Sequence, residues 1–161
     1  MTRKFDVRRL AVRFGFLFLL AMAGLFAMSW SSNPPEFPAE TGAKRIASCP
    51  KSPNCVSTQA TSSEHQMKPV PWTGATDEVV SRIKRAIGDQ FSRSRLVVDR
   101  PNYLRYEVTS LIFRFVDDVE FVIDPETRLI HFRSASRVGH SDLGANRRRM
   151  DRFVEAFERL P

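Results

Sequence analysis

The sequence predicts an α+β fold in which a mostly antiparallel four-stranded sheet, made of two hairpins, carries flanking helices on one face and follows an N-terminal membrane helix. Three observations lead to this prediction. A basic segment precedes an apolar run near the N-terminus, two amphipathic helical patterns bracket the rest of the chain, and β-rich runs joined by turns lie between them. The 161 residues are enough for one domain of ordinary size and an appendage.

The appendage is residues 1–30. Five basic residues against one acidic residue precede an apolar run of 17 residues from Phe14 to Trp30. Such a pattern is typical of a signal anchor or a transmembrane segment, and Trp30 stands where an interfacial aromatic residue would. Small residues at cleavage spacing, around Ala21 and Ala27, leave open a cleaved signal peptide. We therefore expect a single-pass protein of the inner (cytoplasmic) membrane with its C-terminal domain on the periplasmic side, or alternatively a cleaved protein exported to the periplasm.

The basic charge of the chain belongs largely to this targeting segment. The full chain carries a net charge of +7, whereas residues 31–161 hold 20 Lys and Arg against 17 Asp and Glu, a net charge of +3. A nucleic-acid-binding protein needs a basic face on the folded domain itself. We therefore expect no nucleic acid among the partners.

A linker is predicted between the anchor and the domain. Residues 31–45 contain three prolines and few large apolar side chains, which is typical of a flexible Pro-rich tether. The globular α+β domain is expected over residues 46–161.

Two cysteines, Cys49 and Cys55, occur in the segment CPKSPNC. Disulfides persist in translocated domains, so a bridge between them is the simplest interpretation. Buried or reduced thiols, a redox pair and half of a metal site are the alternatives. Redox pairs are usually spaced by two residues, and the three histidines, His65, His131 and His140, show no paired spacing. We expect no metal and no cofactor.

The first half of the domain is predicted to be a helix and a hairpin. Thr76 is a suitable N-cap, and apolar residues then recur at helical spacing, which predicts an amphipathic helix over residues 77–91. Two β-rich runs, 95–99 and 103–109, flank a turn at residues 100–102.

The second hairpin is predicted around the type I turn Asp124–Thr127, with residue 123 opposite residue 128. Alternation then divides its side chains between two faces. The predicted core face holds Phe113, Phe115, Val119, Phe121, Ile123, Ile130 and Phe132; the predicted solvated face holds Arg114, Asp118, Glu120, His131 and Arg133. In this register Asp118 lies opposite Arg133, and Glu120 lies opposite His131.

Asp117 is an exception, because alternation places its carboxylate on the apolar face, where it needs hydrogen bonds or a counterion. The last helix, capped by Ser141, turns Asn146 and Arg147 towards that face, while Arg148, Arg149 and Arg152 are expected in solvent. We therefore predict one polar cluster between sheet and helix, made of Asp117, Ser134, Ser136, Arg137, Asn146 and Arg147.

The same stretch resembles a known family, catalogued as domain of unknown function 1499. The resemblance lies in FVDDVEF at residues 115–121, in RSASR at residues 133–137 and in Asn146-Arg147. Family members carry a similar Cys-Pro-x-Ser-Pro-Asn-Cys-Val-Ser opening, which supports the disulfide. The resemblance implies a shared fold and no particular activity.

Three roles for the polar cluster follow. It locks the helix onto the sheet, or it belongs to an anion site formed by Arg114, Arg133, Arg137 and His140, or it supports hydrolysis around Asp117, Ser134 and Asn146. We expect a non-enzymatic binding or assembly module of the cell envelope, with a small hydrolytic enzyme as the alternative. Its expected partners are the membrane, through the N-terminal helix, and an envelope protein or a small anionic ligand.

Overall fold

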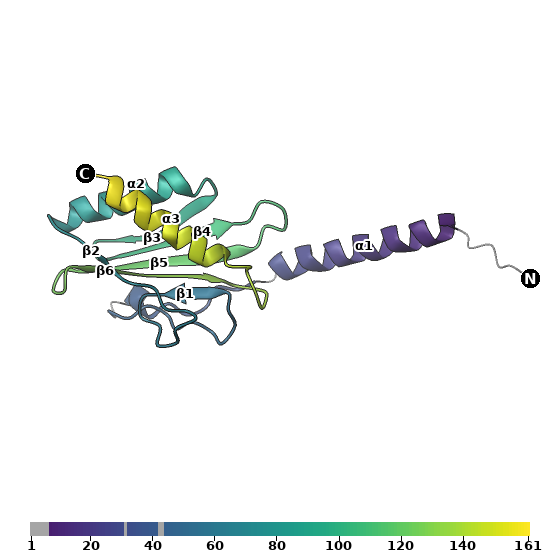
Figure 1. Cartoon of the computed structure of the whole chain (residues 1–161), viewed down its shortest axis with the longest axis horizontal. Coiled ribbons are helices and arrows are strands. Elements are labelled where there is room, and N and C mark those ends of the chain that lie inside the picture. Colours follow the sequence, from purple (N-terminus) through teal and green to yellow (C-terminus); the bar gives the residue numbers. More distant parts are fainter. Residues whose placement is uncertain (1–6, 31, 42–43) are drawn as a thin grey trace, which may run out of the picture.

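The computed structural model describes residues 7–30, 32–41 and 44–161. Within this part of the chain, a six-stranded antiparallel sheet carries two helices on one face, and a long N-terminal helix extends from one end (Figure 1). The elements in order are α1 Val7–Trp30, the 3-10 helix η1 Pro38–Thr41, β1 Cys55–Ser57, β2 Val70–Pro71, α2 Thr76–Gln90, β3 Ser94–Arg100, β4 Tyr103–Thr109, β5 Val116–Asp124, β6 Leu129–Ser136 and α3 Ala145–Arg159.

The α+β class and the two hairpins are confirmed, whereas the count of four strands was wrong. The sheet order is β1-β6-β5-β4-β3, and β2 also pairs with β6, beside its start. The two extra strands are three and two residues long. Strands this short carry no visible alternation, so the sequence pattern does not predict them.

The predicted register of the second hairpin was wrong by two residues. Ile123 pairs with Ile130, and Glu120 therefore lies opposite Arg133 rather than His131. The connection spans residues 125–128, and Arg128 adopts a left-handed backbone with φ of 57°. A type I turn followed by a left-handed residue gives this longer loop. Because the error is an even number of residues, the side chains within β5 and β6 keep their predicted faces.

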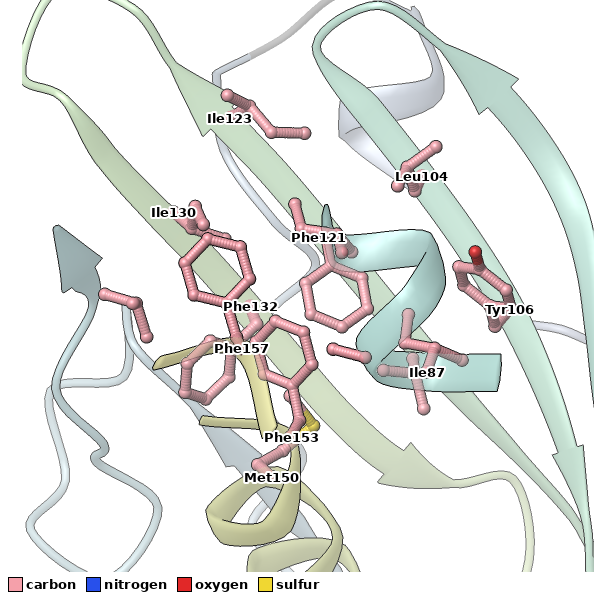
Figure 2. Packing of buried hydrophobic residues seen from close by; sticks show 14 of the residues in the cluster. Ile87, Leu104, Tyr106, Phe121, Ile123, Ile130, Phe132, Met150, Phe153 and Phe157 are labelled. Carbon is pink, nitrogen blue, oxygen red and sulfur yellow. The ribbon is translucent and has the colours of Figure 1, made fainter. Parts of the chain in front are cut away.

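The helices α2 and α3 cover one face of the sheet and enclose the main core. Phe121 of β5 and Phe153 of α3 meet with ring centroids 4.7 Å apart, and Figure 2 shows Phe132 and Phe157 beside them. Phe113 and Phe115, predicted for this core, are only partly buried and stack on each other. The Arg82 guanidinium of α2 donates to the carbonyl oxygens of Phe157 and Leu160 at the end of α3.

The opposite face of the sheet is buried too, which contradicts the predicted solvated ladder. Asp118, Glu120 and Arg133 are respectively 1%, 0% and 4% exposed. The chain ahead of β1 crosses this face and buries Phe37 and Ile46 against it. Part of the segment expected as a linker therefore lies on the sheet, and it removes water from charges that alternation alone assigns to solvent.

Helix α1 contains a 20-residue stretch, Arg8–Ala27, in which 18 consecutive residues have a mean hydropathy of 2.1 and no burial against the rest of the protein. Its length and composition are sufficient to cross a bilayer, and a signal sequence shares these properties. At the end of α1 the Ser29 hydroxyl donates to the Arg114 carbonyl oxygen at 2.7 Å. This contact ties α1 to the loop between β4 and β5.

Candidate functional site

A buried polar cluster lies between the sheet and α3. We call it the inner cluster, and it consists of Asp117, Ser134, Ser136, Asn146 and Arg149. Its first three members come from β5 and β6, on the same face as the main core, and its last two from α3. The structure thus brings together four of the six residues predicted for one cluster.

Asn146 is the centre of this cluster. Its side-chain oxygen accepts a hydrogen bond from the Ser134 hydroxyl at 2.6 Å and another from Arg149. Its amide nitrogen donates to the Ser136 hydroxyl at 3.0 Å and to the Asn54 carbonyl oxygen at 2.9 Å. All four of its hydrogen-bonding positions are therefore used, which is the full capacity of an asparagine side chain.

Arg149 was also predicted to face solvent, and this prediction was wrong. It is 8% exposed, forms an ion pair with Asp117 and donates to the Ser134 hydroxyl at 2.9 Å. The Asp117 carboxylate, which needs a counterion on the apolar face, is thus paired with a residue that lies one helical turn before Phe153. A spacing of four residues puts Arg149 and Phe153 on the same helix face, so the signal was present in the sequence.

The start of α3 is set by Asp142 rather than by Ser141. Its carboxylate accepts hydrogen bonds from the backbone nitrogens of Gly144 and Asn146, at 2.9 and 2.6 Å. Leu143 and Gly144 both have left-handed backbones, so the helix begins only at Ala145. This local geometry aims Asn146 at the sheet.

The disulfide loop supports the inner cluster from outside. Cys49 is bonded to Cys55, which is the first residue of β1. Asn54 lies between the two cysteines, and its backbone carbonyl accepts a hydrogen bond from the Ser136 backbone nitrogen. Its side-chain amide donates to the Gly139 carbonyl oxygen at 2.6 Å. The two segments that carried the family resemblance are therefore joined in space.

Four of the five members of the inner cluster are buried, and Ser136 is partly exposed. Ser134 is 0% exposed, Asn146 is 1% exposed and Asp117 is 7% exposed. The Ser134 hydroxyl is already hydrogen-bonded to both Asn146 and Arg149, and Asp117 is paired. These hydrogen bonds and the ion pair join α3 to the sheet.

A second charged network, which we call the outer network, lies on the opposite face of the sheet. Arg137 belongs here rather than to the inner cluster: it forms two hydrogen bonds of 2.8 Å with Asp118 and another with Glu107. Glu120 accepts from Arg133 at 3.2 Å and from the Tyr103 hydroxyl at 3.1 Å. The remaining members are Arg95, which binds Glu107, and Arg105, which lies over the Phe37 ring.

Burial and pairing shift the pKa values of this network in opposite directions. Burial raises the pKa of the Glu120 carboxyl, and this outweighs the attraction of Arg133. Burial alone would also raise the pKa of Glu107, but the hydrogen bonds from Arg137 and Arg95 reverse the effect and lower it. Hydrogen bonding to Asp118 raises the pKa of Arg137 further above its usual value.

The four residues predicted to form an anion site do not form one together. Arg133 and Arg137 are paired with carboxylates within the outer network. Arg114 lies in the loop between β4 and β5, and His140 lies exposed in the loop before α3.

Arg147, predicted for the polar cluster, instead donates to the backbone carbonyls of Glu64 and Gln66. His131 is half-buried beside Thr58, and burial lowers its pKa.

An open cavity of about 660 Å³ lies beside the disulfide, and we call it the disulfide cavity. It lies between the segment 45–51 and the loop 57–65, and its charged or titratable lining residues are Arg45, Lys51, Glu64 and His65. His65 is held by a 3.2 Å contact between its Nε2 atom and the Ser52 carbonyl oxygen. Within the described ranges, no three His, Cys, Asp or Glu side chains gather as a metal site would.

Comparison with known proteins identifies one family. The family model described as "Protein of unknown function (DUF1499)" matches residues 45–157. No curated protein and no solved structure gives a significant match. The matched range includes the disulfide loop, both hairpins and most of α3, and it covers more than half of the chain. The resemblance seen in the motifs is thereby confirmed, and the chain belongs to the DUF1499 family.

Proposed function

We propose that this protein is a membrane-anchored module of the cell envelope that binds a small anionic ligand, or an anionic group of an envelope protein, in the disulfide cavity. The observation that carries the proposal is a contrast in accessibility. Asp117, Ser134 and Asn146 of the family motif are buried and bonded within the inner cluster, whereas the disulfide cavity is open and carries the exposed cations Arg45 and Lys51.

The charges around the disulfide cavity favour an anion. Arg45 and Lys51 are exposed on its lining, and Glu64 is the carboxylate among the lining residues. The two cations therefore outnumber the one anion. Exposed ammonium and guanidinium groups at a concave site attract carboxylate and phosphate groups and supply charge-assisted hydrogen bonds.

The disulfide makes one wall of this cavity rigid. Cys49 lies on the lining, and its bond to Cys55 fixes the segment that carries Lys51 against β1. On the other wall, the Gln59 side chain accepts from the Ile46 nitrogen at 3.0 Å and so holds the segment that carries Arg45. A preformed site loses less entropy on binding than a flexible one.

Anchoring is the second part of the proposal. The apolar stretch of α1 follows a basic N-terminal segment, and cytoplasmic flanks of membrane helices are enriched in Lys and Arg. With the N-terminus in the cytoplasm, the domain lies on the periplasmic side of the inner membrane. The disulfide suits that oxidising compartment.

A small hydrolytic enzyme built on Asp117 and Ser134 is the alternative, and the burial of both residues argues against it. A catalytic serine must contact its substrate, and the Ser134 side chain has no exposed surface. The hydrolytic proposal would need an opening of α3 away from the sheet.

The test compares what the protein retains when it is purified from its own membrane. The full chain, a cavity variant (Arg45→Glu with Lys51→Glu) and a control variant (Arg152→Glu with Arg159→Glu) are isolated in parallel, and bound small molecules, lipids and proteins are identified by mass spectrometry. We expect at least one anionic species to accompany the wild type and the control and to be lost from the cavity variant. Identical sets from all three proteins would contradict the proposal.

A further inference from the structure

Three large apolar side chains lie exposed on two loops at the end of the sheet from which α1 extends (Figure 1). Leu111 and Ile112, in the loop between β4 and β5, are 69% and 62% exposed, and Leu143, in the loop before α3, is 85% exposed. We call these three residues the apolar tip. Large apolar side chains that are gathered and exposed on one end of a domain favour contact with a partner or a membrane.

The topology places the two loops at the same end. In an antiparallel pair the start of one strand lies beside the end of its neighbour, and Asp117 of β5 pairs with Ser136 of β6. The loop that enters β5 and the loop that leaves β6 are therefore adjacent, and the Arg137 nitrogen donates to the Val116 carbonyl across them. The fold thus gathers Leu111, Ile112 and Leu143 on one end of the domain.

We propose that the apolar tip inserts into the outer surface of the same bilayer that α1 crosses, so that the domain is seated on the membrane rather than suspended above it. This inference rests on the anchoring of α1 proposed above. The occupant of the tip is the lipid interface, because the tip is continuous with the membrane helix. The Ser29 hydroxyl binds the Arg114 carbonyl, which lies two residues after Ile112.

The distances along the helix agree with this placement. The apolar stretch of α1 ends at Ala27, and at about 1.5 Å of rise per residue Ser29 lies only about 3 Å further along the axis. The interfacial layer on each side of a bilayer is roughly 5–7 Å thick, from a hydrocarbon core of about 30 Å and a total of about 40–45 Å. A loop bonded to Ser29 therefore lies within that layer.

Cations flank the apolar tip as they do in interfacial segments. Arg114 is exposed two residues after Ile112, and the exposed Arg148 donates to the Leu143 carbonyl at 2.7 Å. Apolar side chains bordered by arginines fit the boundary between acyl chains and anionic headgroups.

The experiment measures whether lipid touches the tip in the full-length protein. Leu111→Cys is labelled with an environment-sensitive fluorophore, which reacts there alone because the two native cysteines are bonded to each other. The protein is reconstituted in phosphatidylethanolamine and phosphatidylglycerol vesicles with a nitroxide quencher near the headgroup end of the acyl chain. We expect the label to lose most of its emission, and the same at Leu143→Cys. The control, Glu126→Cys, lies on the exposed β5–β6 turn at the far end of the sheet and should keep its emission (Figure 1).

A label at Phe18→Cys, in the middle of α1, is measured in vesicles whose nitroxide lies at the methyl end of the acyl chain, and it separates the two proposals. Quenching at Phe18 and at Leu111 supports both. If the label at Phe18 is quenched but the label at Leu111 emits as strongly as the label at Glu126, the apolar tip does not insert into the bilayer. The proposal that α1 is a membrane anchor is then still supported. No quenching at Phe18 overturns the anchor, and Leu111 still reports on the tip. If the Leu111 label is shielded from water but not quenched, protein covers the tip and the inference is wrong. If Leu111→Cys fails to fold, Ile112→Cys replaces it.

Discussion

Replacing Arg149 by methionine should strongly destabilise the protein. The change keeps an unbranched side chain but removes the guanidinium that pairs with Asp117 and donates to Ser134 and Asn146. The Asp117 carboxylate, 7% exposed, would then be buried without a counterion. Removing one partner of a buried ion pair costs about 3–5 kcal/mol.

The structure narrows the expected loss of unfolding free energy for Arg149→Met. Three hydrogen bonds to a charged group, at about 1.5–3 kcal/mol each, set an upper bound near 9 kcal/mol. The side chains of Asp117 and Arg149 each retain about 10% exposure, so water relieves part of the penalty. We therefore expect a loss of about 3–4 kcal/mol. The double variant Asp117→Leu with Arg149→Met removes both charges and should be more stable than Arg149→Met alone, because no charge is left unpaired.

Guanidinium chloride unfolding of the full chain in detergent, followed by far-ultraviolet circular dichroism, measures these free energies. The control is Arg152→Met on the exposed side of α3, which should change the unfolding free energy by less than about 0.5 kcal/mol. Two results would refute a structural role of the ion pair. One is a loss of unfolding free energy below about 1 kcal/mol for Arg149→Met. The other is a loss in the double variant equal to the sum of the losses in Asp117→Leu and Arg149→Met.

Three further predictions concern the outer network and the disulfide. Arg137→Lys loses the two-pronged contact with Asp118 and should lower the unfolding free energy by about 2–3 kcal/mol, against little change for Arg152→Lys; equal losses would contradict this. The folded protein lowers the pKa of Glu107, so the ionised carboxylate stabilises the fold at pH values above its unfolded pKa, and this stability is lost as the pH falls through the folded pKa. In Glu107→Gln the unfolding free energy should therefore fall less steeply on the acid side of a plot against pH. The same acid-side slope as in the wild type would contradict this prediction. Cys49→Ser with Cys55→Ser should cost about 2–2.5 kcal/mol from the loop-closure entropy, measured by chemical unfolding, and no loss would show that the bond is dispensable.

The sequence predicted the fold class, both hairpins and the inward placement of Asp117, because these depend on local patterns. Alternation alone puts Asp117 beside Val119 and Phe121 on the core face. The register of the β5–β6 hairpin was harder to predict from the sequence. The turn Asp124–Thr127 did not reveal that Arg128 would also leave the strand, and a shift of two residues leaves the alternation unchanged.

The outer network could not be predicted from the hairpin itself. Asp118 and Glu120 are buried because a segment more than seventy residues away in the sequence crosses them. That segment is rich in proline, and its only signals for burial are isolated apolar residues such as Phe37 and Ile46. Arg149 is a different case: its spacing from Phe153 pointed inward, but its position in a run of three arginines suggested a solvated face.

The central claim is that the motif of this family forms a sealed lock rather than an open site. The reactivity of Ser134→Cys in the native full chain tests it most directly, with His140→Cys as an exposed reference. A small thiol reagent should modify the cysteine at position 134 at least roughly a thousandfold more slowly than the one at position 140, because reaction requires an opening of about 4 kcal/mol or more. Comparable rates at the two positions would show an open cleft beside Asp117 and would contradict the account.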